Sequence, residues 1–102
     1  MMDKFVNENR PHPDFRHELD IGWRLEGQSV YLFDIRPLWD GSDVYDQYDY
    51  AKATWVRSQK HWKIYWRLAN LQWYKYQPLE SAGNLQRFLI ETEKDPHGCF
   101  AG

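Results

Sequence analysis

The chain has 102 residues, enough for one domain, and we expect residues 1–102 to form a single unit. Thirteen Lys and Arg stand against fifteen Asp and Glu, which gives a net charge of −2, and hydrophobic residues make up 42% of the sequence. This balance excludes a uniformly basic nucleic-acid clamp, an acidic tail protein and a disordered chain.

A short helix is predicted at the N-terminus, over residues 3–9. It ends before Pro11 and Pro13, because two prolines spaced one residue apart cannot lie inside a helix. Apolar and polar side chains then alternate from Leu19 to Glu26, which is the pattern of a half-buried strand.

A β-hairpin is predicted next. Gly27 is able to adopt positive φ in the turn over 26–29, as a type II′ turn requires. The second strand of the hairpin runs over 30–36 and stops at Pro37. Residues 38–50 are acidic and aromatic, and we expect them to form an irregular loop.

A three-stranded antiparallel meander is the strongest prediction, and its strands are expected over 51–55, 61–68 and 71–76. An even-numbered loop around 58–59 places Trp55 opposite Trp62 and Ala53 opposite Ile64. An odd-numbered loop would mix the two faces, so it is rejected.

The second hairpin of the meander is predicted to turn at the two residues Ala69 and Asn70. The expected pairs are then Leu68 with Leu71, Trp66 with Trp73 and Tyr65 with Tyr74. One sheet face becomes Trp-rich and aliphatic, because side chains alternate along a strand. The opposite face carries Lys52, Thr54, His61, Lys63, Tyr65, Arg67, Tyr74 and Tyr76.

A C-terminal helix follows Pro78. Ser81 or Asn84 is able to cap it, and the segment 95–98 ends it. Its apolar stripe consists of Leu85, Phe88, Leu89 and Thr92. We therefore predict an α+β fold, in which an antiparallel sheet of about five strands has a short N-terminal helix and a C-terminal helix packed on its Trp-rich face.

Five segments, in this order, resemble a family of small bacterial proteins classed as a domain of unknown function. The segments are RPLWD (36–40), AKAT (51–54), WKIYW (62–66), WYKYQP (73–78) and DPHGCF (95–100). The resemblance covers most of the chain after about residue 16. It implies kinship, and the family has no assigned activity to carry over.

The sequence favours a cytoplasmic protein. The single cysteine, Cys99, cannot form a disulfide within the chain, whereas small secreted domains usually carry several. The first ten residues contain no apolar run of signal-peptide length, and no segment approaches the roughly 18 apolar residues of a membrane span. We therefore expect no association with membranes.

The basic and aromatic sheet face is the main functional feature. Residues 51–76 contain six Lys or Arg and no acid. Cations follow a phosphate backbone, and each exposed ring that stacks on a base contributes about 1–3 kcal/mol. We therefore predict a non-catalytic module that binds single-stranded nucleic acid. The predicted contact residues are Lys52, His61, Lys63, Tyr65, Arg67, Tyr74 and Tyr76.

Two alternatives stay open for the same face. It is able to serve as a solvated surface in which Lys and Arg stems cover the Tyr rings. A structural protein that forms a homodimer, or binds another protein, is the second alternative, because an outer strand with surplus Trp, Tyr and Arg invites association.

Metal binding is not predicted. Asp40, Asp43, Asp46 and Asp49 recur at every third position, without the alternating ligands, the glycine and the closing Glu of a calcium loop. The four histidines, His12, His17, His61 and His97, lack zinc-site spacing.

Catalysis is the third-ranked hypothesis, and no catalytic residue or cofactor is predicted. Asp34 lacks a second acid on the next strand for metal-assisted phosphodiester cleavage, so we expect it to pair with Arg36. Cys99 is expected to be a small packed residue. No catalytic triad, phosphate loop or dinucleotide fingerprint occurs.

Overall fold

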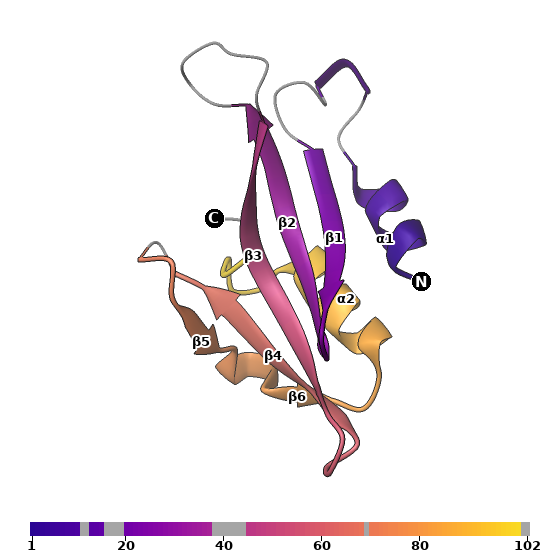
Figure 1. The fold of residues 1–102 in the computed structure, drawn as a ribbon, viewed down its shortest axis with the longest axis vertical. Coiled ribbons are helices and arrows are strands. Elements are labelled where there is room, and N and C mark those ends of the chain that lie inside the picture. The colour runs from indigo at the N-terminus through magenta and orange to yellow at the C-terminus, as the bar shows by residue number, and fades with distance from the viewer. Residues whose placement is uncertain (11–12, 16–19, 38–44, 69, 101–102) are drawn as a thin grey trace.

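The computed structural model describes residues 1–10, 13–15, 20–37, 45–68 and 70–100, and it confirms the predicted α+β class. Strands form one six-stranded antiparallel sheet in the order β1-β2-β3-β4-β5, with β6 also paired to β4 (Figure 1). In chain order the elements are α1 (Met2–Asn9), η1 (Pro13–Phe15), β1 (Asp20–Glu26), β2 (Ser29–Pro37), β3 (Tyr45–Val56), β4 (His61–Arg67), β5 (Trp73–Lys75), η2 (Gln77–Leu79), β6 (Ser81–Ala82) and α2 (Leu85–Lys94).

The N-terminal helix and the first hairpin follow the predicted pattern. Helix α1 buries Met2, Phe5 and Val6 at helical spacing. In the β1–β2 hairpin, Glu26 pairs with Ser29 and Gly27 adopts a φ of +57°, as expected of a type II′ turn. The positive φ explains why glycine occupies this position.

Strand β3 begins earlier than predicted. Residues 45–50 were expected to form a loop, but they pair with β2 as far as Pro37. The alternation of Asp with Tyr hides this strand, because Asp disfavours strands whereas Tyr favours them. The pairing shifts between Leu32 and Phe33, which leaves Tyr50 as an extra residue in a β-bulge.

The first register of the meander is confirmed and the second is wrong. Trp55 pairs with Trp62, as predicted. In the next hairpin, however, Trp66 pairs with Tyr74 and Arg67 with Trp73. The connection is one residue longer than expected, since the Leu68 N–H donates to the carbonyl of Gln72 at 3.1 Å.

Two local features stabilise this longer connection. Leu71 adopts the left-handed conformation, with a φ of +65°. Its N–H donates to the Leu68 carbonyl at 2.9 Å, and the Asn70 side-chain oxygen accepts from the Gln72 N–H at 3.1 Å. A turn that ends in a left-handed residue is a common three-residue hairpin connection.

The altered register moves three aromatic side chains. A slip of one residue turns every side chain of a strand to the opposite face. Trp73 therefore joins the polar face, and Tyr74 lies on the face of Trp66. Tyr76 also leaves the polar face: it is 0% exposed and belongs to the core.

The C-terminal helix confirms the prediction and resolves its cap. The Asn84 side chain accepts from the Arg87 N–H at 2.9 Å, so Asn84 is the cap. Ser81 instead lies in the two-residue strand β6, opposite Lys63. At the other end, Asp95 adopts a left-handed conformation and its N–H donates to the Glu91 carbonyl.

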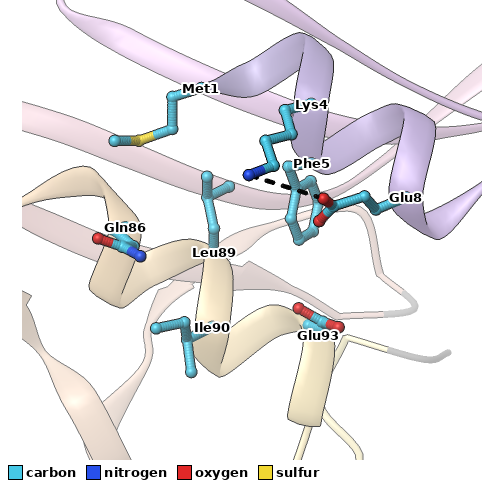
Figure 2. Close-up of a pocket in the computed structure, with 8 residues that line it drawn as sticks. All are labelled: Met1, Lys4, Phe5, Glu8, Gln86, Leu89, Ile90 and Glu93. Atoms are coloured by element: carbon cyan, nitrogen blue, oxygen red, sulfur yellow. Dashed lines mark ion pairs between the residues drawn. The ribbon is translucent and has the colours of Figure 1, made fainter.

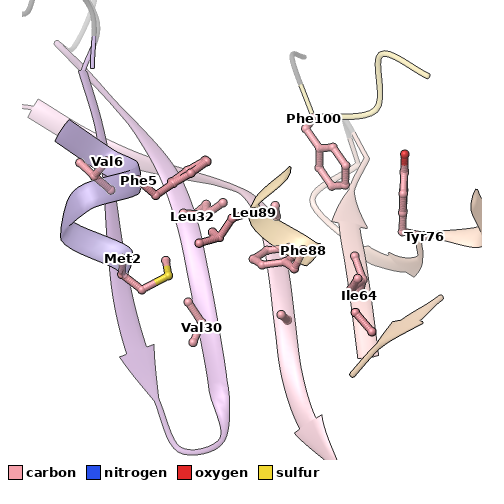
Figure 3. Packing of buried hydrophobic residues seen from close by; sticks show 13 residues of the cluster. Met2, Phe5, Val6, Val30, Leu32, Ile64, Tyr76, Phe88, Leu89 and Phe100 are labelled. Carbon is pink, nitrogen blue, oxygen red and sulfur yellow. The ribbon is translucent and has the colours of Figure 1, made fainter. Parts of the chain in front are cut away.

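Both helices pack on one face of the sheet, where the core lies (Figure 3). Side chains from α1 and α2 meet those of the central strands, and Trp62 and Trp66 pack at the margin. The residues of this core are Met2, Phe5, Val6, Val30, Leu32, Ala51, Ala53, Ile64, Tyr76, Ala82, Phe88, Leu89 and Phe100. The Trp23 indole N–H also donates to Asp3 at 2.8 Å, which ties α1 to β1.

Several sequence predictions fall on residues outside the described ranges. These are the helix-ending positions Pro11 and His12, the strand start at Leu19, the loop over 38–44 and the turn residue Ala69. Within the described ranges, no helix has the length and apolar composition needed to cross a bilayer.

The ring of Phe33 on the neighbouring strand leaves too little space for a side chain at position 22. A Cβ at position 22 would lie 2.7 Å from two carbons of that ring. Gly22→Ala should therefore lower the free energy of unfolding by about 1–3 kcal/mol, measured by urea denaturation. Gly83→Ala is the matched control, since a Cβ there meets nothing within 4 Å. Equal decreases in the two variants would contradict this packing argument.

Leu71 carries backbone strain in an exposed position, since its side chain is 65% exposed. Leu71→Gly should raise the free energy of unfolding by about 0.5–1 kcal/mol, because glycine adopts positive φ without steric cost. Leu25→Gly is the control: Leu25 is similarly exposed but lies in regular strand, so its replacement should destabilise the protein. Destabilisation by both changes would exclude the strain.

Candidate nucleic-acid interface

The open face is the sheet surface opposite α1 and α2. Antiparallel partners point to the same side, so the pairs Arg24–Tyr31, Tyr31–Lys52, Lys52–Tyr65 and Tyr65–Lys75 define it. Five predicted contact residues belong to this face: Lys52, His61, Lys63, Tyr65 and Arg67. Trp73 and Lys75 join them because of the β4–β5 register.

An aromatic box encloses the ammonium group of Lys52. Its Nζ lies 4.7 Å from the ring centroid of Trp73, 4.9 Å from that of Tyr65 and 5.8 Å from that of Tyr31. The faces of these rings are electron-rich and attract a cation. Burial lowers the pKa of Lys52, while Asp49 acts in the opposite sense. Lys52 therefore lies within the face and contacts all three rings.

Asp49 organises the arginines of the open face. Its oxygens accept from Arg24 Nη1 at 2.5 Å and Nη2 at 2.8 Å, the bidentate geometry that suits a guanidinium. This hydrogen-bonded pair raises the pKa of Arg24. Arg67 Nη1 lies 3.9 Å from the same carboxylate. The sequence pattern did not reveal this role of Asp49, because residues 38–50 were expected to form a loop.

Besides Lys52 in its aromatic box, four cations of the 51–76 segment make no ion pair with any described residue. They are Arg57, Lys60, Lys63 and Lys75. Arg57 and Lys60 lie at the exposed β3–β4 turn, whereas Lys63 and Lys75 lie on the open face. These positive charges are available to an external anion.

Tyr76 cannot contact a ligand in this fold. Its hydroxyl donates to Glu91 Oε1 at 2.8 Å, and its ring centroid lies 4.7 Å from that of Phe100. Burial raises the pKa of Tyr76, and the hydrogen bond to Glu91 adds to the effect. Tyr74 is 42% exposed but lies on the opposite face.

Asp34 and Cys99, the carboxylate and the thiol considered as reactive groups, both lie in partly buried positions. Arg36 donates to Asp34 at 3.1 Å, which confirms the predicted ion pair, and burial raises the pKa of that carboxyl. Burial also raises the pKa of the half-buried Cys99 thiol, which disfavours the nucleophilic thiolate.

The acidic repeat does not gather into one site where the structure describes it. Asp46 and Asp49 point to opposite faces of the sheet, since three positions separate them along β3. Asp40 and Asp43 lie outside the described residues. Across the described ranges, no group of three His, Cys, Asp or Glu side chains is arranged to hold a metal ion.

A groove of about 330 Å³ separates the two helices (Figure 2). Lys4 and Glu8 form an ion pair at 3.9 Å on the α1 side. The groove is lined by Met1, Lys4, Phe5, Glu8, Gln86, Leu89, Ile90 and Glu93. Its walls combine apolar side chains with flexible charged ones and contain no candidate nucleophile.

Comparison with known proteins identifies the family. A family model described as a domain of unknown function, DUF3024, matches residues 1–102, so the chain belongs to this family. No curated protein and no solved structure matches the chain.

The buried Tyr76–Glu91 hydrogen bond should make the free energy of unfolding depend on pH in the alkaline range. Because the pKa of Tyr76 is raised by folding, its contribution to stability is complete below pH 10 and falls as the pH rises further. Tyr76→Phe should lower the free energy of unfolding at pH 7 by about 1–3 kcal/mol. It should also weaken the decrease of stability above pH 10, measured by denaturation at several pH values.

The exposed Tyr74 provides the control. Tyr74→Phe removes an exposed hydroxyl instead and should leave the free energy of unfolding at pH 7 nearly unchanged. An identical response of the two variants would show that the buried hydrogen bond has no stabilising role.

Proposed function

We propose that this DUF3024 protein binds single-stranded nucleic acid on its open face and catalyses no reaction. One observation carries the proposal. A sheet face on which neither helix packs combines the rings of Tyr65 and Trp73 with the ammonium groups of Lys63 and Lys75, which pair with no carboxylate of the described residues. Stacking rings beside backbone-tracking cations are the two components of a single-strand binding surface.

Charge distribution supports this proposal. The whole chain carries a net charge of −2, yet residues 51–76 carry six cations and no acid. Asp49 neutralises part of this charge through Arg67 and leaves the ammonium groups of Lys63 and Lys75 untouched. A phosphate backbone that replaces its counterions with these groups gains affinity that depends on salt.

The aromatic box supplies the proposed stacking platform. Tyr65 and Trp73 are half-buried on the open face, and the ammonium group of Lys52 lies within 5 Å of both ring centroids, a contact that favours one orientation of each ring. A ring that is already immobilised loses little conformational entropy when a base stacks on it. Lys52 thus has a positioning role in this proposal rather than a phosphate-binding one.

The contact set changes accordingly. Lys63, Tyr65 and Arg67 stay in the proposal, and Trp73 and Lys75 are added to it. His61 remains beside them, while the buried Tyr76 and the oppositely placed Tyr74 are withdrawn.

Binding of a fluorescent single-stranded DNA or RNA pool, measured at two salt concentrations, tests the proposal. Lys63→Ala/Arg67→Ala should weaken binding and should lower the slope of log affinity against log salt by about 0.7 for each phosphate that is no longer neutralised. Arg87→Ala/Lys94→Ala on α2 removes the same charge away from the open face and should leave affinity nearly unchanged.

Two outcomes would overturn the proposal. One is the absence of affinity for wild-type protein at low salt, and the other is an equal decrease of affinity in both double variants. Sedimentation of the same wild-type sample addresses the alternative of self-association, because a mass that doubles with concentration and is restored to monomer by Lys63→Ala/Arg67→Ala would assign the face to a second copy.

A further inference from the structure

We infer that a hollow on the open face seats a phosphate group. The inference rests on the proposed function, because it assigns one backbone phosphate of the bound strand to a defined position. The hollow lies where β4 changes its neighbour: β5 pairs with Tyr65–Arg67, and β6 pairs with Trp62 and Lys63. Between the two, the chain leaves the sheet through η2.

The size of the hollow favours a small anion. Its volume is about 170 Å³. Pockets for drug-sized ligands have volumes of about 300–1,000 Å³, and one water occupies about 30 Å³ in the liquid. The space therefore accommodates a compact oxyanion and its hydration rather than a whole nucleotide. Its lining residues are Gln59, His61, Lys63, Lys75, Glu80 and Ser81.

The charges around the hollow favour an anion as well. Lys63 and Lys75 occupy diagonal positions on neighbouring strands, and neither forms an ion pair with a described residue. Like charges that share a face repel each other. The carboxylate of Glu80 also lines the hollow, but it makes no ion pair with either lysine, so two cations outweigh one acid.

Hydrogen-bonding capacity is available at the same place. Ser81 contributes a hydroxyl opposite Lys63, and Gln59 contributes an amide. The Nε2 atom of His61 is buried and has no hydrogen-bond partner among the described residues. Because this nitrogen is buried, it is not presented to the hollow, and the hydrogen-bonding side chains that line the hollow beside the lysines are those of Ser81 and Gln59.

The cations at the centre of the open face already contact rings or a carboxylate, whereas the two lysines of the hollow have no ion-pair partner among the described residues. Lys52 is enclosed by rings, and Arg24 is held by Asp49. Lys75 lies two residues from Trp73 on the same side of β5, roughly 7 Å along the strand. A phosphate in the hollow therefore leaves its adjacent base within reach of the aromatic box.

Titration with inorganic phosphate at constant ionic strength, followed by ¹H–¹⁵N NMR, tests the inference. We expect saturable shifts at the backbone amides of residues 61–63 and 80–82. Lys63→Ala/Lys75→Ala should weaken phosphate affinity about tenfold or more, since it removes two charged donors. The control Arg57→Ala/Lys60→Ala removes the same charge at the β3–β4 turn and should retain the affinity.

The outcomes separate this inference from the proposed function. Shifts that do not saturate, or an equal weakening in both double variants, overturn the phosphate seat, even where an oligonucleotide still binds. Saturable phosphate binding without oligonucleotide binding supports the seat, assigns it to a free phosphate or phosphorylated small molecule, and overturns the nucleic-acid proposal. Loss of both affinities in Lys63→Ala/Lys75→Ala supports the seat and the proposal together.

Discussion

The β4–β5 connection is the constraint on which the two faces of the sheet depend. Leu71 in its left-handed conformation and the Asn70 side chain set the pairing of Leu68 with Gln72. Because strand side chains alternate, this pairing turns Trp73 to the open face. The same connection positions Tyr76 over Ile64, where it enters the core and bonds to Glu91. One turn thus divides the late aromatic residues between the core and the surface.

On the open face, some cations contact Asp49 or aromatic rings, whereas others have no such partner among the described residues. Asp49 and the aromatic box engage Arg24, Arg67 and Lys52, and these contacts order the centre of the face. Such interactions gain from their partly buried setting, where charges are less screened than in water. Lys63 and Lys75 lie farther along the sheet and have no such partner among the described residues. A surface divided in this way presents aromatic rings next to cations that have no described ion-pair partner, which is why a phosphate-containing strand is the ligand we propose.

The face on which the helices pack is mainly apolar and buried. Helix α1 packs against β1, and α2 packs over β3, where the small residues Ala51 and Ala53 allow a close approach. The Tyr76 hydroxyl, a polar group within this core, has its partner in Glu91. Asp34 and Cys99, the two candidates for reactive groups nearest this face, have raised pKa values because burial favours their neutral forms. This face therefore stabilises the fold, whereas the binding that we propose involves the other face.

Local sequence patterns correctly predicted the α+β class, the hairpin at Gly27, the pairing of Trp55 with Trp62 and a C-terminal helix that ends at Asp95. Each of these features depends on local periodicity or on one turn or cap residue. Contacts between segments that are distant in the sequence determine the start of β3, the partners of Asp49 and the faces of Trp73 and Tyr76, and the sequence pattern did not predict these features. The acidic segment 45–50 is identified as a strand only by its pairing with β2, and the sequence around Asn70 is compatible with a turn of either two or three residues. The net charge of −2 likewise does not show how the charges are distributed. The fold determines which cations pair with carboxylates and which stay available to a ligand.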